Sequence, residues 1–500
     1  MITVKLMSHS KLRIETDKGI LWEIREHFSF FVPGYKFMPK YRQGFWDGKI
    51  RIFDYNTQSI PAGLWWKLKK FCKSRNYPIS VKRHPEFGSP EDKGKVDPQE
   101  IWNFVKDLKV SSKGKDITIR DYQFNAVCEA LTEKRCLLIS PTASGKSLII
   151  YCILRWIQAS LEENERILVI VPTTALVEQM YSDFADYAAK DDSWDAGENC
   201  HRIYSGKEKV NILQGVFIST WQSIYKLPKT WFRQFKLIFG DEAHGFTANS
   251  MEKAMEKAEL AEYRIGTTGT LSGSKTHEMV LEGIFGKIIR VTTTAELQRK
   301  KEIADLHIKR MILEYNPEDR AVACGLKYHD EIKWLITNDD RNKLIRNLAC
   351  SLEGNTIVMF RFIEHGKELY EMIKDKSKDR VFYVAGATHT DDREAIRRIV
   401  ETQKNAKIVA SDGVFSTGTN IKNLHNMIFT TPSKAQIRVL QSIGRTLRQS
   451  DNGVDSTLYD MIDDLRKSSK TNYAWKHGEV RRNIYDEEQF KYETHKVKMK

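Results

Sequence analysis

The sequence predicts an α/β protein in which two successive lobes, each built on a parallel sheet, follow a small α+β domain. Residues 101–294 alternate short apolar runs with helical patterns, and residues 297–465 repeat that alternation. Largely apolar strands separated by helices are typical of parallel sheets with helices on both faces. The length of the chain also fits one small domain and two lobes, because 500 residues correspond to about three domains.

The apolar runs give the expected strands of each lobe. In the first lobe they lie at residues 136–139, 167–171, 216–219, 237–239 and 264–266. In the second lobe they lie at residues 356–360, 381–384, 408–411, 427–430 and 457–462. We therefore expect domains at residues 1–95, 96–294 and 295–465, followed by a solvated basic extension at 466–500.

The N-terminal section alternates short strands with two helical patterns. The strands are expected at residues 3–6, 12–15, 49–53 and 79–82, and the helices at 20–28 and 64–75. Up to Pro85 this section carries about eleven more basic than acidic residues, together with many aromatic ones. We expect a hairpin turn at residues 46–49. Aromatic rings stack on unpaired bases and basic groups follow phosphates, so the candidate DNA contacts are Trp46, Lys49 and Arg51.

The charge and the cysteine content favour an intracellular protein that binds nucleic acid. The net charge of +14 suits a nucleic-acid partner, since each lysine or arginine contact with phosphate releases counterions. Seven cysteines without a CxxC pair argue against a disulfide framework and a zinc site, and they favour a reducing cytoplasm. No apolar run approaches the length of about 20 residues that a membrane span needs, and no secretory signal is recognisable.

Residues 140–147, Ser-Pro-Thr-Ala-Ser-Gly-Lys-Ser, follow an expected strand and begin an expected helix. This context is typical of a phosphate-binding loop, whose backbone N–H groups wrap phosphates at a helix N-terminus. Lys146 is expected on the β and γ phosphates of ATP, and Ser147 on Mg²⁺. The other loop residues expected around the phosphates are Thr142, Ala143, Ser144 and Gly145. Ser140 replaces the first glycine of the general pattern.

An acidic segment, Asp241-Glu242-Ala243-His244, follows the apolar run 237–239 with only Gly240 between them. Carboxylates at the carboxyl end of a strand face the phosphate loop in such folds. Asp241 is expected to hold Mg²⁺ through water, and Glu242 to orient and deprotonate the attacking water. A helix N-terminus would also favour acidic residues, but the order and spacing after Lys146 favour the nucleotide site.

A basic segment in the second lobe, Gln441-Ser-Ile-Gly-Arg-Thr-Leu-Arg448, offers candidates for transition-state stabilisation. Arg445 and Arg448 are three residues apart, so they share a face of a helix. Arginines placed on the γ-phosphate accelerate phosphoryl transfer by about 10³–10⁵. We expect ATP to bind between the two lobes, with Gln441 in the same segment.

These segments, in this order, resemble the motifs of superfamily 2 helicases over residues 117–464. The resemblance implies two RecA-like lobes, ATP and Mg²⁺ as cofactors, and a nucleic-acid partner. It implies that Arg120 and Gln123 read the adenine, and that Gly418 and Asn420 lie at the ribose. Asn420 stands where an aspartate is common, and its amide can accept a hydrogen bond but carries no charge.

The same resemblance assigns further roles by motif. It places nucleic-acid phosphates at Pro172, Thr173, Thr174, Gly206, Thr220, Trp221, Gly386 and Ser411. It couples ATP hydrolysis to strand handling through His244, Thr268 and Thr270.

Within the superfamily, the chain is similar to the UvsW-type recombination and repair helicases of T-even-like phages. The similarity includes residues 44–51 and 53–56 of the N-terminal section, which other helicases lack, and residues 413–418 and 422–425. It implies a 3′-to-5′ translocase on branched DNA that migrates Holliday junctions, regresses forks and unwinds R-loops. RNA in R-loops and other replication and recombination proteins are then further partners. The alternatives are an RNA helicase, an ATP-regulated DNA-binding or strand-annealing module, and the motor subunit of a nuclease complex.

Overall fold

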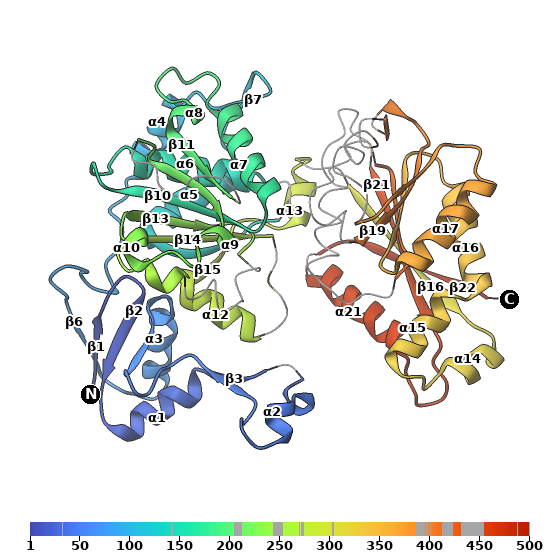
Figure 1. Ribbon diagram of the computed structural model, residues 1–500, viewed down its shortest axis with the longest axis horizontal. Coiled ribbons are helices and arrows are strands. Elements are labelled where there is room, and N and C mark those ends of the chain that lie inside the picture. The colour runs from blue at the N-terminus through green and yellow to red at the C-terminus, as the bar shows by residue number, and fades with distance from the viewer. Residues whose placement is uncertain are drawn as a thin grey trace. The chain divides into compact units, whose positions relative to one another are not determined.

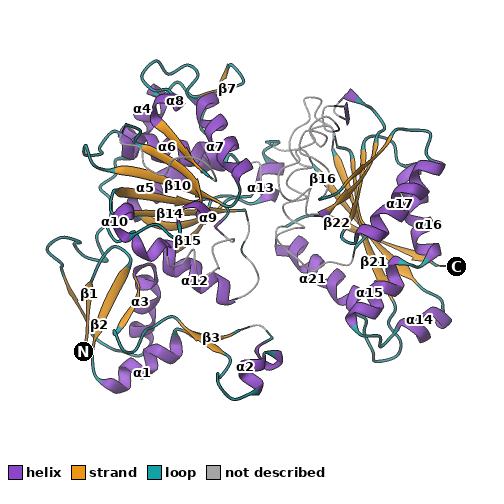
Figure 2. Cartoon of the chain, viewed as in Figure 1, coloured by secondary structure: helices purple, strands orange, loops and turns teal. Residues whose placement is uncertain are grey.

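The computed structural model describes residues 1–32, 34–141, 144–204, 213–243, 254–269, 271, 275–302, 305–386, 396, 399–400, 402–412, 424–431, 455–487 and 489–499. The chain forms two compact units, which contain residues 1–140 with 144–292, and residues 141–143 with 293–500. Figure 1 and Figure 2 show that each unit contains strands between helices. Each has one seven-stranded sheet, which confirms the predicted fold class.

The N-terminal domain is built on a mixed four-stranded sheet with the order β5–β2–β1–β6, in which only the β1–β6 pair is parallel. Helices α1 and α3 pack their apolar faces into its core, where Trp65 is buried. Asp17 caps α1 by accepting a hydrogen bond from the backbone N–H of Ile20. The elements are β1 (Ile2–Leu6), β2 (Lys11–Glu15), α1 (Lys18–His27), β5 (Ser59–Pro61), η2 (Ala62–Leu64), α3 (Trp65–Ser74) and β6 (Ile79–Lys82).

An arm leaves this domain between α1 and β5. We define the arm as residues 29–32 and 34–51, which contain β3 (Ser29–Phe31), η1 (Tyr35–Phe37), α2 (Pro39–Arg42) and β4 (Lys49–Arg51). The predicted hairpin turn at 46–49 is wrong, because β4 pairs antiparallel with the distant strand β3. A tight Asp-Gly hairpin turn needs positive φ at both central residues, and here only Gly48 has it, at 84°.

The first lobe carries the sheet β11–β12–β10–β13–β14–β9–β15, in which every neighbouring pair is parallel. The strands are β9 (Arg135–Ile139), β10 (Arg166–Val171), β11 (Cys200–Ile203), β12 (Val216–Thr220), β13 (Phe235–Gly240), β14 (Tyr263–Thr268) and β15 (Lys287–Arg290). The helices are α4 (Pro98–Asp107), α5 (Asp121–Glu133), α6 (Lys146–Gln158), α7 (Thr174–Tyr187), α8 (Ala196–Asn199), α9 (Trp221–Ile224), α10 (Lys229–Phe232) and α12 (Lys275–Phe285), and a short hairpin joins β7 (Ser111–Ser112) to β8 (Lys115–Asp116).

Side chains of each central strand alternate between two cores, one on either face of this sheet. Ile167 and Val169 of β10 lie in the core that α4, α5, α6 and α7 cover. Leu168 and Ile170 lie in the core that α10 and α12 cover. A strand that is buried on both faces has no polar side, which is why the sequence shows continuous apolar runs here.

The N-terminal domain packs directly on α12 of the first lobe. Met279 of α12 contacts the N-terminal core, and the ammonium of Lys67 pairs with the buried carboxylate of Glu282. A Cβ atom at Gly63 would lie 2.1 Å from the carbonyl oxygen of Glu282. Glycine is therefore required where η2 meets α12.

The second lobe carries the parallel sheet β18–β19–β17–β20–β21–β16–β22. The strands are β16 (Leu306–Glu314), β17 (Thr356–Phe360), β18 (Val381–Val384), β19 (Lys407–Ser411), β20 (Asn426–Phe429), β21 (Ser456–Asp464) and β22 (Tyr492–Lys498). The helices with described bounds are α13 (Thr294–Arg299), α14 (Pro317–Ala323), α15 (Tyr328–Ile336), α16 (Asp339–Ser351), α17 (Ile363–Lys376) and α21 (Tyr473–Glu487). No helix of the described residues is long and apolar enough to cross a bilayer.

The C-terminal residues are part of this lobe, which corrects the expectation of a separate solvated extension at 466–500. Strand β22 pairs in parallel with β16 along its whole length. The carboxylate of Glu331 accepts hydrogen bonds from the backbone N–H groups of Tyr473 and Ala474 and so fixes the start of α21. The basic composition of the segment reflects the exposed face of an edge strand. The predicted limits at residues 95 and 294 stay predictions.

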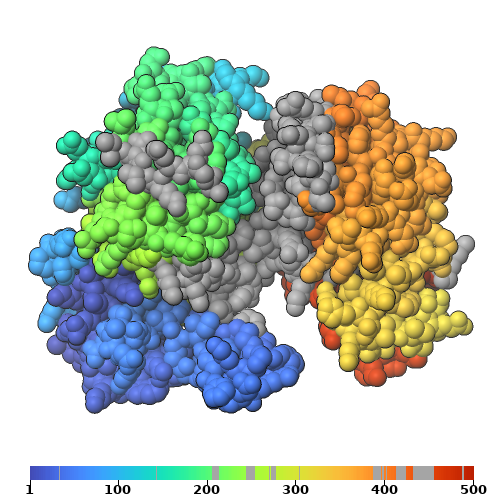
Figure 3. Space-filling model, in the orientation of Figure 1, coloured from blue at the N-terminus to red at the C-terminus, as the bar shows by residue number. Residues whose placement is uncertain are grey.

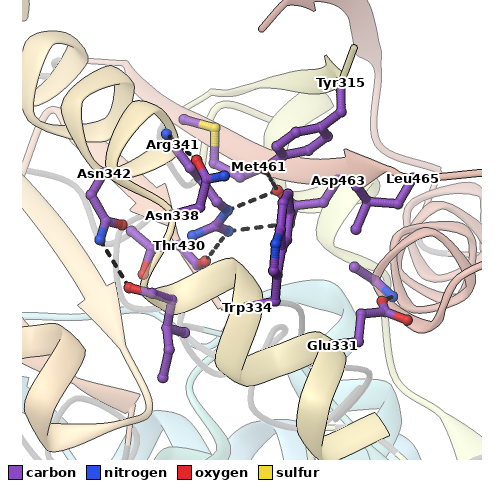
Figure 4. Close-up of polar contacts among 12 residues, drawn as sticks. Tyr315, Glu331, Trp334, Asn338, Arg341, Asn342, Thr430, Met461, Asp463 and Leu465 are labelled. Carbon is purple, nitrogen blue, oxygen red and sulfur yellow. Dashed lines mark hydrogen bonds and ion pairs between the residues drawn. The ribbon is translucent and has the colours of Figure 1, made fainter. Parts of the chain in front are cut away.

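A buried ion pair lies at the centre of the second lobe (Figure 4). The Nε atom of Arg341, on α16, donates to a carboxylate oxygen of Asp463 on β21 at 2.7 Å, and both side chains are fully buried. The hydroxyl of Tyr315 donates to the same carboxylate at 2.9 Å, and Arg341 also donates to the carbonyl oxygen of Thr430. Burial and the Asp463 charge raise the pKa of Tyr315 well above its usual range. The cluster therefore ties α16 to strands of the sheet.

Replacing Arg341 by Met is expected to destabilise the second lobe by about 3–5 kcal/mol, because it leaves the Asp463 carboxylate buried without its partner. Hydrogen exchange of the β21 amides, measured by mass spectrometry, reports this change. Lys343→Met on the same helix is the matched control: its ion pair with Asp340 is half exposed and contributes less than about 0.5 kcal/mol. Equal exchange rates in the two variants would contradict the assignment.

Candidate active site

The parallel order of the first sheet brings the predicted nucleotide residues to one edge. Strands β9, β14 and β13 are neighbours, with Thr268 opposite Ile139 and Gly240 opposite Gly266. The phosphate loop follows β9, Asp241 follows β13, and Thr268 ends β14. All three segments therefore leave the sheet at its carboxyl edge, as the crossover rule for parallel strands requires.

The phosphate loop is attached to the segment predicted to read adenine. The carbonyl oxygen of Ser144 accepts hydrogen bonds from Gln123 Nε2 at 2.7 Å and from the Tyr122 hydroxyl at 3.1 Å. Gln123 is buried, and its Oε1 accepts from the backbone N–H of Arg120 at 2.9 Å. Gly145 has φ of 79°, and a Cβ there would lie 2.2 Å from Gln123 Nε2. These contacts fix the loop immediately before α6 begins at Lys146.

Lys146 and the acidic segment face one another. The Nζ atom of Lys146 lies 3.9 Å from Glu242 Oε1 and donates to the carbonyl oxygen of Ser140 at 3.3 Å. Glu242 has φ of 49°, in the left-handed region that a non-glycine residue rarely adopts. Backbone strain of this kind concentrates at functional sites, where surrounding contacts maintain it. The structure thus brings Lys146 and Glu242 together as predicted from their spacing.

Asp241 is buried beside these residues. Its Oδ1 accepts a hydrogen bond from the Thr267 hydroxyl at 2.7 Å. Burial raises the pKa of Asp241 to about 6, and the neighbouring Glu242 charge adds to the effect. Burial disfavours the ionised form of this carboxylate, and a nearby cation would stabilise that form. Asp241 and Ser147 both offer oxygen atoms, the ligand type that Mg²⁺ prefers.

Sequence reasoning missed two side chains of this site. Thr267, on β14, holds Asp241, although the motif assigned importance to its neighbour Thr268. Tyr187, at the end of α7, has its hydroxyl 2.8 Å from that of Ser147. Thr268 itself is buried, and its carbonyl oxygen accepts from the backbone N–H of Ser140. The only sequence signal for Thr267 was its place in an apolar strand, and Tyr187 had none.

The segments predicted to contact nucleic acid in the first lobe follow β10 and β12, next to the nucleotide strands in the sheet. Thr173 caps α7 by accepting from the N–H of Leu176, and Thr174 is exposed beside it. Pro172 is half-buried. Thr220 is buried with its hydroxyl on Ser223, and Trp221 lies half-buried against Tyr225. In the second lobe, Ser411 ends β19 and the exposed Gly386 follows the neighbouring strand β18.

Other predicted site residues lie outside the described residues, so their roles stay predictions: Thr142, Ala143, Gly206, His244, Thr270, Gly418, Asn420, Gln441, Arg445 and Arg448.

The three predicted DNA contacts of the arm bond within the protein. Lys49 pairs with Glu26 at 2.5 Å, and Arg51 pairs with Asp47 and with Glu26. The Lys49 hydrogen bond lowers the pKa of Glu26, and the Arg51 hydrogen bond lowers that of Asp47 to about 2. The indole N–H of Trp46 donates to the carbonyl oxygen of Lys49 at 2.8 Å. These side chains stabilise the base of the arm.

Comparison with known proteins gives the family. The ATP-dependent DNA helicase uvsW of Enterobacteria phage T4 is 35% identical over 507 residues, which cover 98% of each chain. The chain belongs to the UvsW family of superfamily 2 helicases. The crystal structure of T4 UvsW matches with a TM-score of 0.53 and 34% identity over 99% of both chains. The DNA 3'-5' translocase XPB2 of Sulfurisphaera tokodaii is 22% identical over 67% of this chain and 80% of its own length.

Models of protein families match each section of this UvsW-family chain. The N-terminal domain of DNA helicase UvsW matches residues 1–82, and the res subunit of type III restriction enzymes matches residues 116–273. The helicase conserved C-terminal domain matches residues 340–450. The chain is accordingly an ATP-dependent DNA helicase, which confirms the predicted enzyme class.

Asp241→Asn is expected to stabilise the nucleotide-free protein by about 1–3 kcal/mol above pH 6, because it removes a buried charge. The raised pKa of about 6 means that the wild-type carboxylate loses stability as pH rises from about 4 to 6. The difference in melting temperature between the two proteins should therefore be largest above pH 6 and vanish near pH 4. Calorimetry from pH 4 to 8 checks this, and a constant difference would contradict it.

Proposed function

We propose that the chain uses ATP hydrolysis to remodel branched DNA, by migrating Holliday junctions, regressing forks and unwinding R-loops. The supporting observation is the sheet edge of the first lobe, where the phosphate loop, the acidic segment and the candidate DNA segments follow neighbouring strands. The match of residues 1–82 to the N-terminal domain of DNA helicase UvsW extends the likeness beyond the motor itself. A 3′-to-5′ direction is proposed from the translocase relative.

In this proposal each residue of the nucleotide site has one task. Lys146 binds the β and γ phosphates, and its ammonium lies near the carboxylate of Glu242. Glu242 orients the attacking water and accepts its proton. Mg²⁺, held by Ser147 and Asp241, would neutralise phosphate charge. Thr267 holds the Asp241 carboxylate in place through its hydroxyl.

Helix α7 is the element that we propose couples the nucleotide to DNA. The candidate phosphate contacts are its N-cap, Thr173, and its first residue, Thr174, and its last residue, Tyr187, hydrogen-bonds Ser147. A rigid helix with DNA contacts at one end and a residue of the nucleotide site at the other can transmit a displacement between them. Binding energy for DNA phosphates at one end would then depend on the nucleotide state at the other.

We place this activity in the cytoplasm of the bacterial host, because the UvsW relative is a phage protein and all seven cysteines are free thiols.

Glu242→Gln should retain ATP binding and lose turnover by at least about 100-fold, because it removes the general base but keeps the shape of the side chain. Lys146→Ala should lose both. Fluorescent-nucleotide binding and phosphate release measure the two properties. Glu163→Gln, which changes an exposed carboxylate of the same lobe, is the control and should hydrolyse ATP normally. Turnover in Glu242→Gln equal to that of the control would exclude Glu242 as the base.

The choice of substrate is tested by the ATPase rate at one salt concentration. The additions are none, single-stranded DNA, duplex DNA, a four-way junction, a fork and RNA, each in turn. We expect the junction and the fork to stimulate most. Strongest stimulation by RNA would instead favour an RNA helicase. An ATPase rate that is the same with every addition would contradict the proposal that the chain translocates on nucleic acid.

A further inference from the structure

The arm presents two phenylalanine rings to solvent. Phe37 is 77% exposed and Phe45 is 82% exposed, which makes them the two most exposed aromatic residues in the described part of the chain. Exposing a large apolar ring to water is unfavourable, and such rings concentrate where a protein binds a partner. Figure 1 and Figure 3 show the arm extending away from the four-stranded sheet of its own domain.

The arm does not need these rings for its own packing. Phe31 stacks on Tyr35 at 4.7 Å, and Tyr41 meets Tyr35 edge-on at 4.8 Å. Gly48 lies under Tyr35, since a Cβ there would approach the ring to 2.2 Å. Phe37 and Phe45 take no part in this cluster, so their exposure is not forced by folding of the arm.

Backbone hydrogen bonds order the chain at both phenylalanines. The N–H of Phe45 donates to the carbonyl oxygen of Lys40 at 3.0 Å, and the N–H of Phe37 donates to that of Gly34 at 2.9 Å. The guanidinium of Arg42 donates to the carbonyl oxygen of Lys36. The two rings therefore stand on an ordered scaffold, which lowers the entropy lost on binding.

The charge around the rings is basic. Lys49 and Arg51 at the base of the arm are neutralised by Glu26 and Asp47. No ion pair of the described residues engages the other three basic side chains of the arm, which are Lys36, Lys40 and Arg42. Along the chain, Lys36 directly precedes Phe37, and Lys40 and Arg42 lie between Phe37 and Phe45. Basic groups for a phosphate backbone and aromatic rings for its bases are together typical of surfaces that bind single strands.

We propose that the arm binds unpaired DNA at a branch point, with Phe37 and Phe45 stacking on exposed bases and Lys36, Lys40 and Arg42 contacting phosphates. The faces of paired bases are covered by their neighbours, so a stacking ring needs unpaired bases. The phenylalanine side chain has no hydrogen-bonding group, so we expect this contact not to depend on the base sequence. The inference rests on the proposed action on branched DNA, and it assigns recognition of the unpaired strand to a site outside the motor lobes.

The test uses the full chain with Phe37→Ala and Phe45→Ala combined. Fluorescence anisotropy at one salt concentration measures binding to a fork with two unpaired thymidine arms and to a blunt duplex with the same base pairs. We expect the affinity for the fork to fall by about tenfold or more, because stacking on each base contributes substantially, and the affinity for the duplex to stay within about twofold. The DNA-independent ATPase rate should be unchanged.

Three control variants distinguish aromatic stacking from a purely apolar contact. Met7→Ala removes an exposed apolar side chain of the same domain outside the arm, and it should bind like the wild type. Trp at both positions should restore fork binding, whereas Leu at both should not, because Leu keeps the apolar area without a π face. Leu variants that bind like the wild type would overturn the stacking proposal and favour a protein partner for the arm.

Two further outcomes would also overturn it. Equal losses on the fork and the duplex would show that unpaired bases are not what the rings recognise. Wild-type affinity of the double Ala variant, in a protein whose ATPase is stimulated by the fork, would remove the arm from the DNA path while leaving the proposed function intact. A wild-type protein that no branched DNA stimulates would instead contradict the proposed function itself.

Discussion

The parallel register of β9, β14 and β13 is the constraint on which the site of the first lobe depends. It places the ends of three strands side by side, so that a loop, an acidic pair and a threonine from distant parts of the sequence meet. Sheet hydrogen bonds fix this arrangement more firmly than side-chain contacts could. The N–H of Ser140 on the carbonyl oxygen of Thr268 extends the same ladder into the phosphate loop.

The two units differ in how far hydrogen-bond donors compensate a buried carboxylate. Asp463 is surrounded by donors from Arg341 and Tyr315, so its ionised form is compensated. Asp241 has one hydroxyl donor from Thr267 and a second carboxylate beside it, and its pKa rises. The first arrangement stabilises a fold, whereas the second retains unfavourable electrostatic energy at the carboxylate that we propose holds Mg²⁺.

Sequence patterns predicted the central strands because burial on both faces makes them continuously apolar, as in β10 and β17. They missed β16 and β22, where charged residues interrupt the pattern. Arg310 of β16 is buried and pairs with Glu479, and β22 is an exposed edge. In the site, spacing predicted Lys146 and Glu242 but could not predict Tyr187, nor that Lys49 and Arg51 bond to neighbours. Those contacts arise from tertiary packing that a linear pattern does not contain.

Strand β22 is one edge of the second sheet, and its only neighbour among the described strands of that sheet, β16, lies far upstream in the sequence. During synthesis β16 emerges before both of its neighbours, so its backbone groups stay unpaired in the sheet until residues 456–464 and 492–498 have left the ribosome. The sheet of the second lobe therefore cannot assemble in the order in which its strands are made, and a change that blocks β22 would leave the unpaired edge of β16 open to pairing with neighbouring nascent chains.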